Sequence, residues 1–141
     1  KGCHDASDLY IFCGHGAGEK VCDHQQLRGC RYPASLLWGC SSGRLVSHGV
    51  HDPSGPVLDY LLAGSPWILG NLWDVTDKDI DKLSMQCMRC LLGYYDSNDS
   101  HQEQGHGHVS LALVESREAC KLKHIVGCAP VLYGIPMPLC I

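Results

Sequence analysis

Short apolar runs alternate with longer segments of helical periodicity along this chain. The runs Leu9–Cys13 and Ser35–Gly39 lie next to glycines, and Trp67–Trp73 and Pro130–Tyr133 have the same character. Runs of this length are typical of strands buried on both faces of a sheet. The periodic segments between them are Val57–Ala63, Asp77–Leu92 and Val109–Cys120. Because strands that alternate with helices pair in parallel, the pattern predicts an α/β fold, a three-layer sandwich around a mostly parallel sheet.

The overall composition fits one domain and excludes two classes of protein. The 141 residues are enough for a single hydrophobic core, which is the organisation we expect. A net charge of −4 and the absence of a basic run argue against a nucleic-acid-binding protein. No apolar run reaches the roughly 18 residues of a membrane span. The chain begins at Lys1, and we expect it to be the C-terminal piece of a longer protein.

Most of the ten cysteines lie inside apolar segments. Examples are Cys13, Cys87, Cys90 and Cys128. Thiols in such segments behave as small buried hydrophobic groups, so we expect reduced cysteines and a reducing compartment. A contrasting segment covers residues 93–108, which is polar and holds His101, His106 and His108. We predict that it is an exposed loop.

Residues that could take part in catalysis lie directly after three of the predicted strands. In parallel α/β sheets the ligand site lies beyond the carboxyl ends of the strands. Cys40 follows the second run, and His15 follows the first between two glycines. A thiol needs a neighbouring base to become a nucleophile at neutral pH, and His15 could supply it. The backbone amides of Gly16 and Cys40 could then point at a developing oxyanion.

A second nucleophile is available in the same segment. Gly39–Gly43 reads GCSSG, which also matches the G-x-S-x-G elbow that presents a serine, here Ser41. His124 could serve as its base further along the chain. The order of residues is unfavourable, because the histidine-glycine turn precedes the elbow, and the domain is small for a hydrolase of this type.

A metal-binding interaction module is the third alternative. Cys87 and Cys90 have two residues between them and are followed by the histidines of segment 93–108, which resembles the ligand spacing of small zinc sites. Their place in an apolar periodic segment argues against it, because their sulfurs would face the core. We expect His48 and His51, in the loop after Cys40, to lie in solvent.

Four blocks of sequence carry a resemblance to a known family. They read GHGAGE (14–19), LLWGCSSG (36–43), DYLLAGSPWILGNLWDVTDKDID (59–81) and ESREACKLKHIVGCAPVLYGIP (115–136). Together they resemble the C-terminal catalytic domain of separases, the caspase-like cysteine proteases that open cohesin at anaphase. The resemblance spans roughly residues 8–136, and NLWDVTDKDID is its most specific block. It covers the last part of that domain, so we expect residues 1–141 to form a caspase-like sandwich truncated at its N-terminal side.

The resemblance implies a function and a set of site residues. His15 and Cys40 would form the catalytic dyad, and cleavage would follow an arginine in the kleisin subunit of cohesin. A securin-like pseudosubstrate would inhibit the site, no cofactor would be needed, and the protein would act in cytoplasm and nucleus, at chromosomes and spindle during mitosis. Among the acids after the third run, we expect Asp81, and next Asp77, to bind the arginine guanidinium. Asp74 is expected to cap or anchor the loop.

Overall fold

The computed structural model describes residues 8–16, 32–93 and 107–139. It divides into two compact units. The first runs to Val75 and includes Ala129–Ile135, and the second comprises Thr76–Cys128 and the segment from Pro136 onward. In the described part of the chain, no helix combines the length and the apolar character that crossing a membrane requires.

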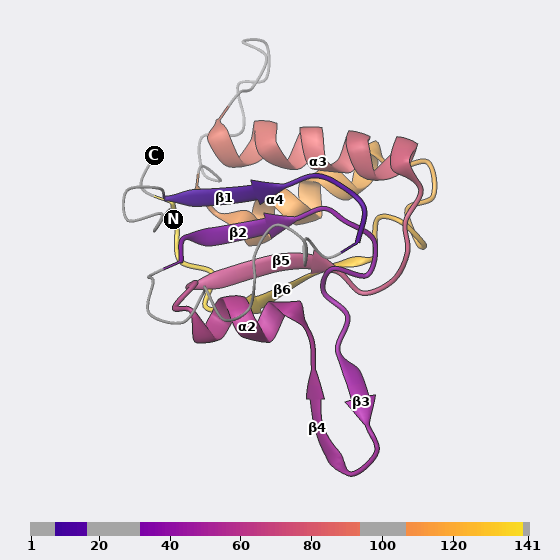
Figure 1. The fold of residues 1–141 in the computed structure, drawn as a ribbon. Helices are drawn as coiled ribbons and strands as arrows, with labels where there is room; N and C mark the ends of the chain where they lie inside the picture. The colour runs from indigo at the N-terminus through magenta and orange to yellow at the C-terminus, as the bar shows by residue number, and fades with distance from the viewer. Residues whose placement is uncertain (1–7, 17–31, 94–106, 140–141) are drawn as a thin grey trace, which may run out of the picture. The chain divides into compact units, whose positions relative to one another are not determined.

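The first unit is built on a four-stranded sheet (Figure 1). Its strands are β1 (Leu9–Phe12), β2 (Ala34–Leu37), β5 (Trp67–Asn71) and β6 (Pro130–Gly134), in the order β1-β2-β5-β6. β1 pairs with β2 and β2 with β5 in parallel. The α/β class and the mostly parallel sheet predicted from the sequence are therefore confirmed.

β6 is the exception to parallel pairing, since it pairs antiparallel with β5, with Asn71 opposite Pro130. One expectation about these strands is wrong: β1 is not buried on both faces, since Ile11 is 43% exposed. Its position explains this exposure, because β1 is an edge strand of the sheet that the described residues form.

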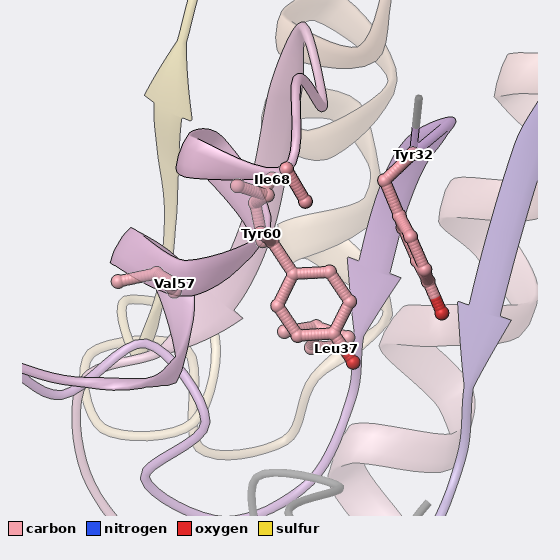
Figure 2. Packing of buried hydrophobic residues seen from close by; sticks show 6 residues of the cluster. Tyr32, Leu37, Val57, Tyr60 and Ile68 are labelled. Atoms are coloured by element: carbon pink, nitrogen blue, oxygen red, sulfur yellow. The ribbon is translucent and has the colours of Figure 1, made fainter. Parts of the chain in front are cut away.

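One face of the sheet is covered by α2 (Pro56–Leu62). The helix starts with a proline, whose fixed φ suits a first helical position, and it buries Val57 and Tyr60. Tyr60 packs with Leu37 of β2 and Ile68 of β5 in one hydrophobic cluster (Figure 2). Fully burying a side chain of this size contributes about 1.5–3 kcal/mol to the stability of the fold. Packing of α2 therefore stabilises the arrangement of β2 beside β5.

A two-stranded hairpin leaves the sheet after the Cys40 turn (Figure 1). β3 (Val46–His48) and β4 (His51–Ser54) pair antiparallel, with His48 opposite His51. The prediction that both histidines lie in solvent is confirmed, since every residue of the hairpin is exposed. The sequence pattern predicted a loop here, without strands.

The second unit contains α3 (Asp77–Leu92), α4 (Val109–Ser116) and the 3₁₀ turn η1 (Arg117–Ala119). α3 ends at Gly93, which adopts the left-handed conformation that glycine accepts without a steric cost. Most of the predicted exposed loop, residues 94–106, lies outside the described residues. At its far end, Gly107 is buried and donates to the Leu91 carbonyl oxygen, so that end lies against α3.

The cysteines divide by position. Cys87, Cys90 and Cys120 are buried, and the first two were predicted to be. Cys13 and Cys128 are exposed, so the expectation of burial is wrong for them. Both stand at the end of an apolar run, where the chain leaves the sheet or enters it.

Candidate active site

His15 and Cys40 leave the sheet from equivalent positions. The last paired residues of β1 and β2 are Phe12 and Leu37, and each candidate lies three residues beyond its strand. The ladder continues for one further step, because the Trp38 amide donates to the Phe12 carbonyl oxygen at 2.9 Å. Parallel pairing therefore brings the two loops to the same edge of the sheet, as the sequence predicted.

The two loops touch through glycines. A Cβ atom on Gly39 would lie 1.7 Å from the Gly16 carbonyl oxygen and 2.9 Å from that of Gly14. No real side chain fits there, so this position needs a residue without one. His15 stands between these two carbonyl groups in sequence and is exposed, while Gly39 directly precedes Cys40. The segment that carries the candidate base thus rests on the residue before the candidate nucleophile.

The Cys40 thiol is half-buried against the loop that follows β5. Its sulfur donates to the Val75 carbonyl oxygen at 3.4 Å and accepts from the Val75 amide at 3.5 Å. The carbonyl suits the protonated thiol, and the N–H is a donor available to a thiolate. The Val75 backbone therefore offers a partner to the sulfur in both protonation states.

Ser41 has a different environment. It adopts a left-handed φ of 53°, as an elbow residue would, but its hydroxyl donates to Asp74 Oδ1 at 2.7 Å. Its backbone amide donates to the Trp73 carbonyl oxygen at 3.2 Å. No histidine among the described residues contacts the Ser41 hydroxyl, so this part of the chain supplies no base of the kind that an elbow nucleophile needs. Asp74 anchors the loop, as predicted, while Thr76 and not Asp74 precedes α3 as its N-cap.

Asn71 lies beneath the turn and is not among the site residues that the sequence predicted. It is fully buried at the end of β5, and its Nδ2 donates to the carbonyl oxygens of Trp38 at 3.2 Å and Gly39 at 3.0 Å. Its own amide donates to the Ser42 hydroxyl at 3.0 Å. A signal was present, because an asparagine inside the apolar run WILGNLW is a polar residue where the pattern demands an apolar one.

Both expected oxyanion donors are available. Across the described residues, no acceptor is paired with the backbone amide of Gly16 or of Cys40. Gly16 has φ 71°, a conformation that favours glycine and turns the chain sharply after His15.

The acidic residues of α3 belong to the second unit and differ in burial. Asp77 and Asp81 are exposed, and Asp81 is engaged through its backbone carbonyl, which accepts from the Ser84 hydroxyl at 2.9 Å. Asp79 is buried, and its Oδ2 accepts from the Leu122 amide at 2.9 Å. The arginine-binding role of Asp81 and Asp77 stays a prediction.

The environment of Cys87 and Cys90 does not favour a metal site. Both lie buried in α3, and burial raises the pKa of the Cys87 thiol to about 12. Zinc binds thiolates, which this environment disfavours. No group of three histidine, cysteine, aspartate or glutamate side chains among the described residues could hold a metal ion. His101 and His106 lie outside that part of the chain.

Comparison with known proteins places this chain in a family. Residues 5–80, more than half of the 141, match the model of "Separin, protease domain". The chain is 44% identical to mouse separin and 40% identical to separin of Saccharomyces cerevisiae, over 94% and 93% of its length. It covers only 6% and 8% of those two proteins.

A solved structure agrees with this match. The chain is similar to a chain in the crystal structure of the Saccharomyces cerevisiae separase-securin complex, with a TM-score of 0.80 and 38% identity. That similarity covers 95% of the present chain and 9% of the other. The family match, the sequence identity and the shared fold lead to one conclusion: this chain belongs to the separin family and corresponds to its protease domain.

Proposed function

We propose that this chain carries the catalytic dyad of a cysteine endopeptidase, with Cys40 as nucleophile and His15 as general base and acid. The observation that carries the proposal is the register of β1 and β2. It sets His15 and Cys40 three residues beyond the paired residues Phe12 and Leu37. The contact of Gly16 with Gly39 supports it, because it closes the gap between the two loops.

The reaction is an acyl transfer in two steps. His15 takes the proton of the Cys40 thiol, and the thiolate attacks the scissile carbonyl carbon to give a tetrahedral oxyanion that the amides of Gly16 and Cys40 stabilise. The amine leaves with the proton held by His15, and an acyl-enzyme remains. A water molecule, deprotonated by His15, then attacks the thioester and releases the acid and the free thiol.

The proposed substrate has arginine on the acyl side of the cleaved bond. Asp81, with Asp77 second, would accept the guanidinium, because a carboxylate pairs with it in two parallel hydrogen bonds. Both carboxylates are exposed and hence open to an incoming cation. Family membership supports the kleisin subunit of cohesin as substrate, and the separase-securin complex supports a securin-like inhibitor as partner.

Active-site labelling tests this function. The full-length protein that carries this chain is treated with a biotinylated peptidyl-arginine acyloxymethyl ketone, which alkylates an activated thiol. We expect label on Cys40 in the wild-type protein, none in Cys40→Ser, strong reduction in His15→Ala, and retention in Ser41→Ala.

The same set of variants separates the alternatives. Label that survives in Cys40→Ser and disappears in Ser41→Ala would identify a serine hydrolase and overturn the proposal. A matched probe with glutamate in place of arginine is the specificity control. Equal labelling by both probes would remove arginine from the proposal but keep the thiol.

A further inference from the structure

The peptide bond between Gly39 and Cys40 has a fixed orientation. Its carbonyl oxygen accepts from Asn71 Nδ2 at 3.0 Å and from the Ser42 amide at 3.4 Å. No peptide bond in the described chain is cis. In a planar trans peptide the C=O and the N–H point in opposite directions. Because the carbonyl of Gly39 points at a buried side chain, the Cys40 N–H points away from it.

The Asn71 side chain can hold only this arrangement. Its NH₂ group faces two carbonyl oxygens, those of Trp38 and Gly39, and an amide turned by 180° would set its own oxygen against both of them. Asn71 Oδ1 is buried and has no partner among the described residues. An unpaired buried acceptor destabilises the fold. The two hydrogen bonds that the Asn71 NH₂ group donates hold the side chain here in spite of this loss of stability.

The position of Asn71 is itself fixed by the sheet and the turn. Its backbone amide donates to the Ser42 hydroxyl, and its carbonyl oxygen accepts from the Gly43 amide at 2.8 Å. The Ser42 hydroxyl in turn donates to the Leu37 carbonyl oxygen at 2.7 Å. The end of β5 is therefore bonded to both sides of the turn that carries Cys40.

We infer that Asn71 is a positioning residue of the oxyanion hole: it holds the Gly39 carbonyl inward and so aims the Cys40 N–H at the substrate carbonyl oxygen. This inference rests on the proposed function. In this role Asn71 touches neither the substrate nor the sulfur, and it acts by fixing the orientation of the Cys40 amide.

The experiment compares Asn71→Ala and the near-isosteric Asn71→Asp with wild type in the full-length protein. Ser65→Ala is the matched control, because the Ser65 hydroxyl is also buried and donates to two carbonyl oxygens, of Pro33 and Trp67, away from the turn. Four quantities are measured. They are kcat and KM for an arginine peptide, the inhibition constant of a peptidyl-arginine aldehyde, and the rate of Cys40 alkylation by iodoacetamide.

The oxyanion hole affects these quantities differently. The aldehyde forms a tetrahedral adduct that uses the hole, whereas iodoacetamide reacts with the sulfur alone. We expect kcat to fall about 100-fold in both Asn71 variants, with a parallel loss of aldehyde affinity. KM and the alkylation rate should stay within about threefold of wild type, as should all four quantities in Ser65→Ala.

Three other outcomes overturn the inference or its basis. Alkylation that slows as much as kcat would make Asn71 a general support of the turn, and unchanged kcat would remove it from catalysis. Activity that survives in Cys40→Ser would instead refute the proposed function.

If the variants do not fold, hydrogen exchange of the wild-type Cys40 amide tests the inference instead. We expect rapid exchange in the unliganded protein and protection with the aldehyde bound, and slow exchange in the unliganded protein would overturn the inference.

Discussion

The Ser41 hydroxyl donates to Asp74 Oδ1 at 2.7 Å and thereby ties the residue after Cys40 to the residue before Val75. Cys40 and Val75 are themselves in contact through the sulfur. Two adjacent residues of one turn thus bind two adjacent residues of one loop. The side-chain bond is exposed, but it restrains the same two segments whose contact sets the position of the thiol.

Removing this tie should lower activity moderately. Ser41→Ala and Asp74→Ala each lose an exposed hydrogen bond worth about 1 kcal/mol, and we expect roughly a fivefold fall in kcat/KM. Asp74→Asn keeps an oxygen that accepts from the hydroxyl, so it should stay near wild type. Peptide hydrolysis by the three variants checks this. A loss in Asp74→Asn as large as in Asp74→Ala would show that the charge matters and not the bond.

The close approach of Gly39 to Gly16 predicts a severe effect from a single methyl group. In Gly39→Ala the new Cβ would lie 1.7 Å from the Gly16 carbonyl oxygen, so one of the two loops must move. A shift of about 1 Å at a catalytic group can reduce turnover about 100-fold, and we expect at least that loss.

Gly14→Ala is the matched control for this prediction. Its Cβ would meet the Phe12 ring at 3.0 Å, and a side chain can yield where a backbone carbonyl cannot. Turnover in this variant should stay within a few-fold of wild type. Similar losses in both variants would mean that the loops do not depend on the Gly39 contact.

The sequence predicted the parts of this structure that depend on local pattern. Apolar runs located β1, β2, β5 and β6 to within one or two residues, and the periodicity of 77–92 predicted α3 with its observed first and last residues. The antiparallel direction of β6 was out of reach, because a run of five residues contains no information on the direction of its partner. The hairpin β3–β4 was missed because its strands bury nothing and β4 includes Pro53, which counts against a strand.

The candidate site, like the fold, was predicted from the sequence only in part. His15 and Cys40 were predicted from their places after neighbouring strands, a relation that parallel pairing guarantees. The contacts of Asn71 with Gly39 and of Ser41 with Asp74 join residues 32 and 33 positions apart. The hydrophobic periodicity of the sequence does not predict these long-range contacts, because they depend on how β2 and β5 align in the sheet. The sequence offered one hint, a polar residue inside a buried strand.

The burial of Cys87 predicts a loss of stability in alkali. Its pKa is about 12 in the folded protein against an ordinary 9.0, so between these values the unfolded state releases the proton first. Stability from this thiol is therefore complete below pH 9 and falls as the pH rises towards 12. By pH 10.5 the loss is about 2 kcal/mol. Urea unfolding of the protein at pH 8 and 10.5 measures it.

The variant Cys87→Ala should lack this component of the pH dependence, although its cavity lowers stability at pH 8 as well. The exposed Cys128 supplies the control, because Cys128→Ala removes a thiol that is not buried. If Cys87→Ala loses as much stability in alkali as wild type does, the thiol is not held protonated by its surroundings.

The two acidic residues Asp79 and Asp81 should separate stability from specificity. Asp79 is buried and accepts from the Leu122 amide, so Asp79→Ala leaves that N–H without its acceptor and should cost about 1–3 kcal/mol of unfolding free energy. Asp81 is exposed and its carboxylate has no hydrogen-bonding partner among the described residues, so Asp81→Asn should change stability by less than about 0.5 kcal/mol.

Activity should respond in the opposite order. If Asp81 receives the arginine guanidinium, Asp81→Asn removes a paired charge, and kcat/KM for arginine peptides should fall about 100-fold, with a smaller change for peptides with an uncharged citrulline in its place. Asp79→Asn, which keeps an acceptor for Leu122, should leave kcat/KM for both peptides nearly unchanged. An Asp81→Asn variant that still prefers arginine to citrulline as wild type does would assign the pocket to another carboxylate. Asp77→Asn would then be measured with the same pair of peptides.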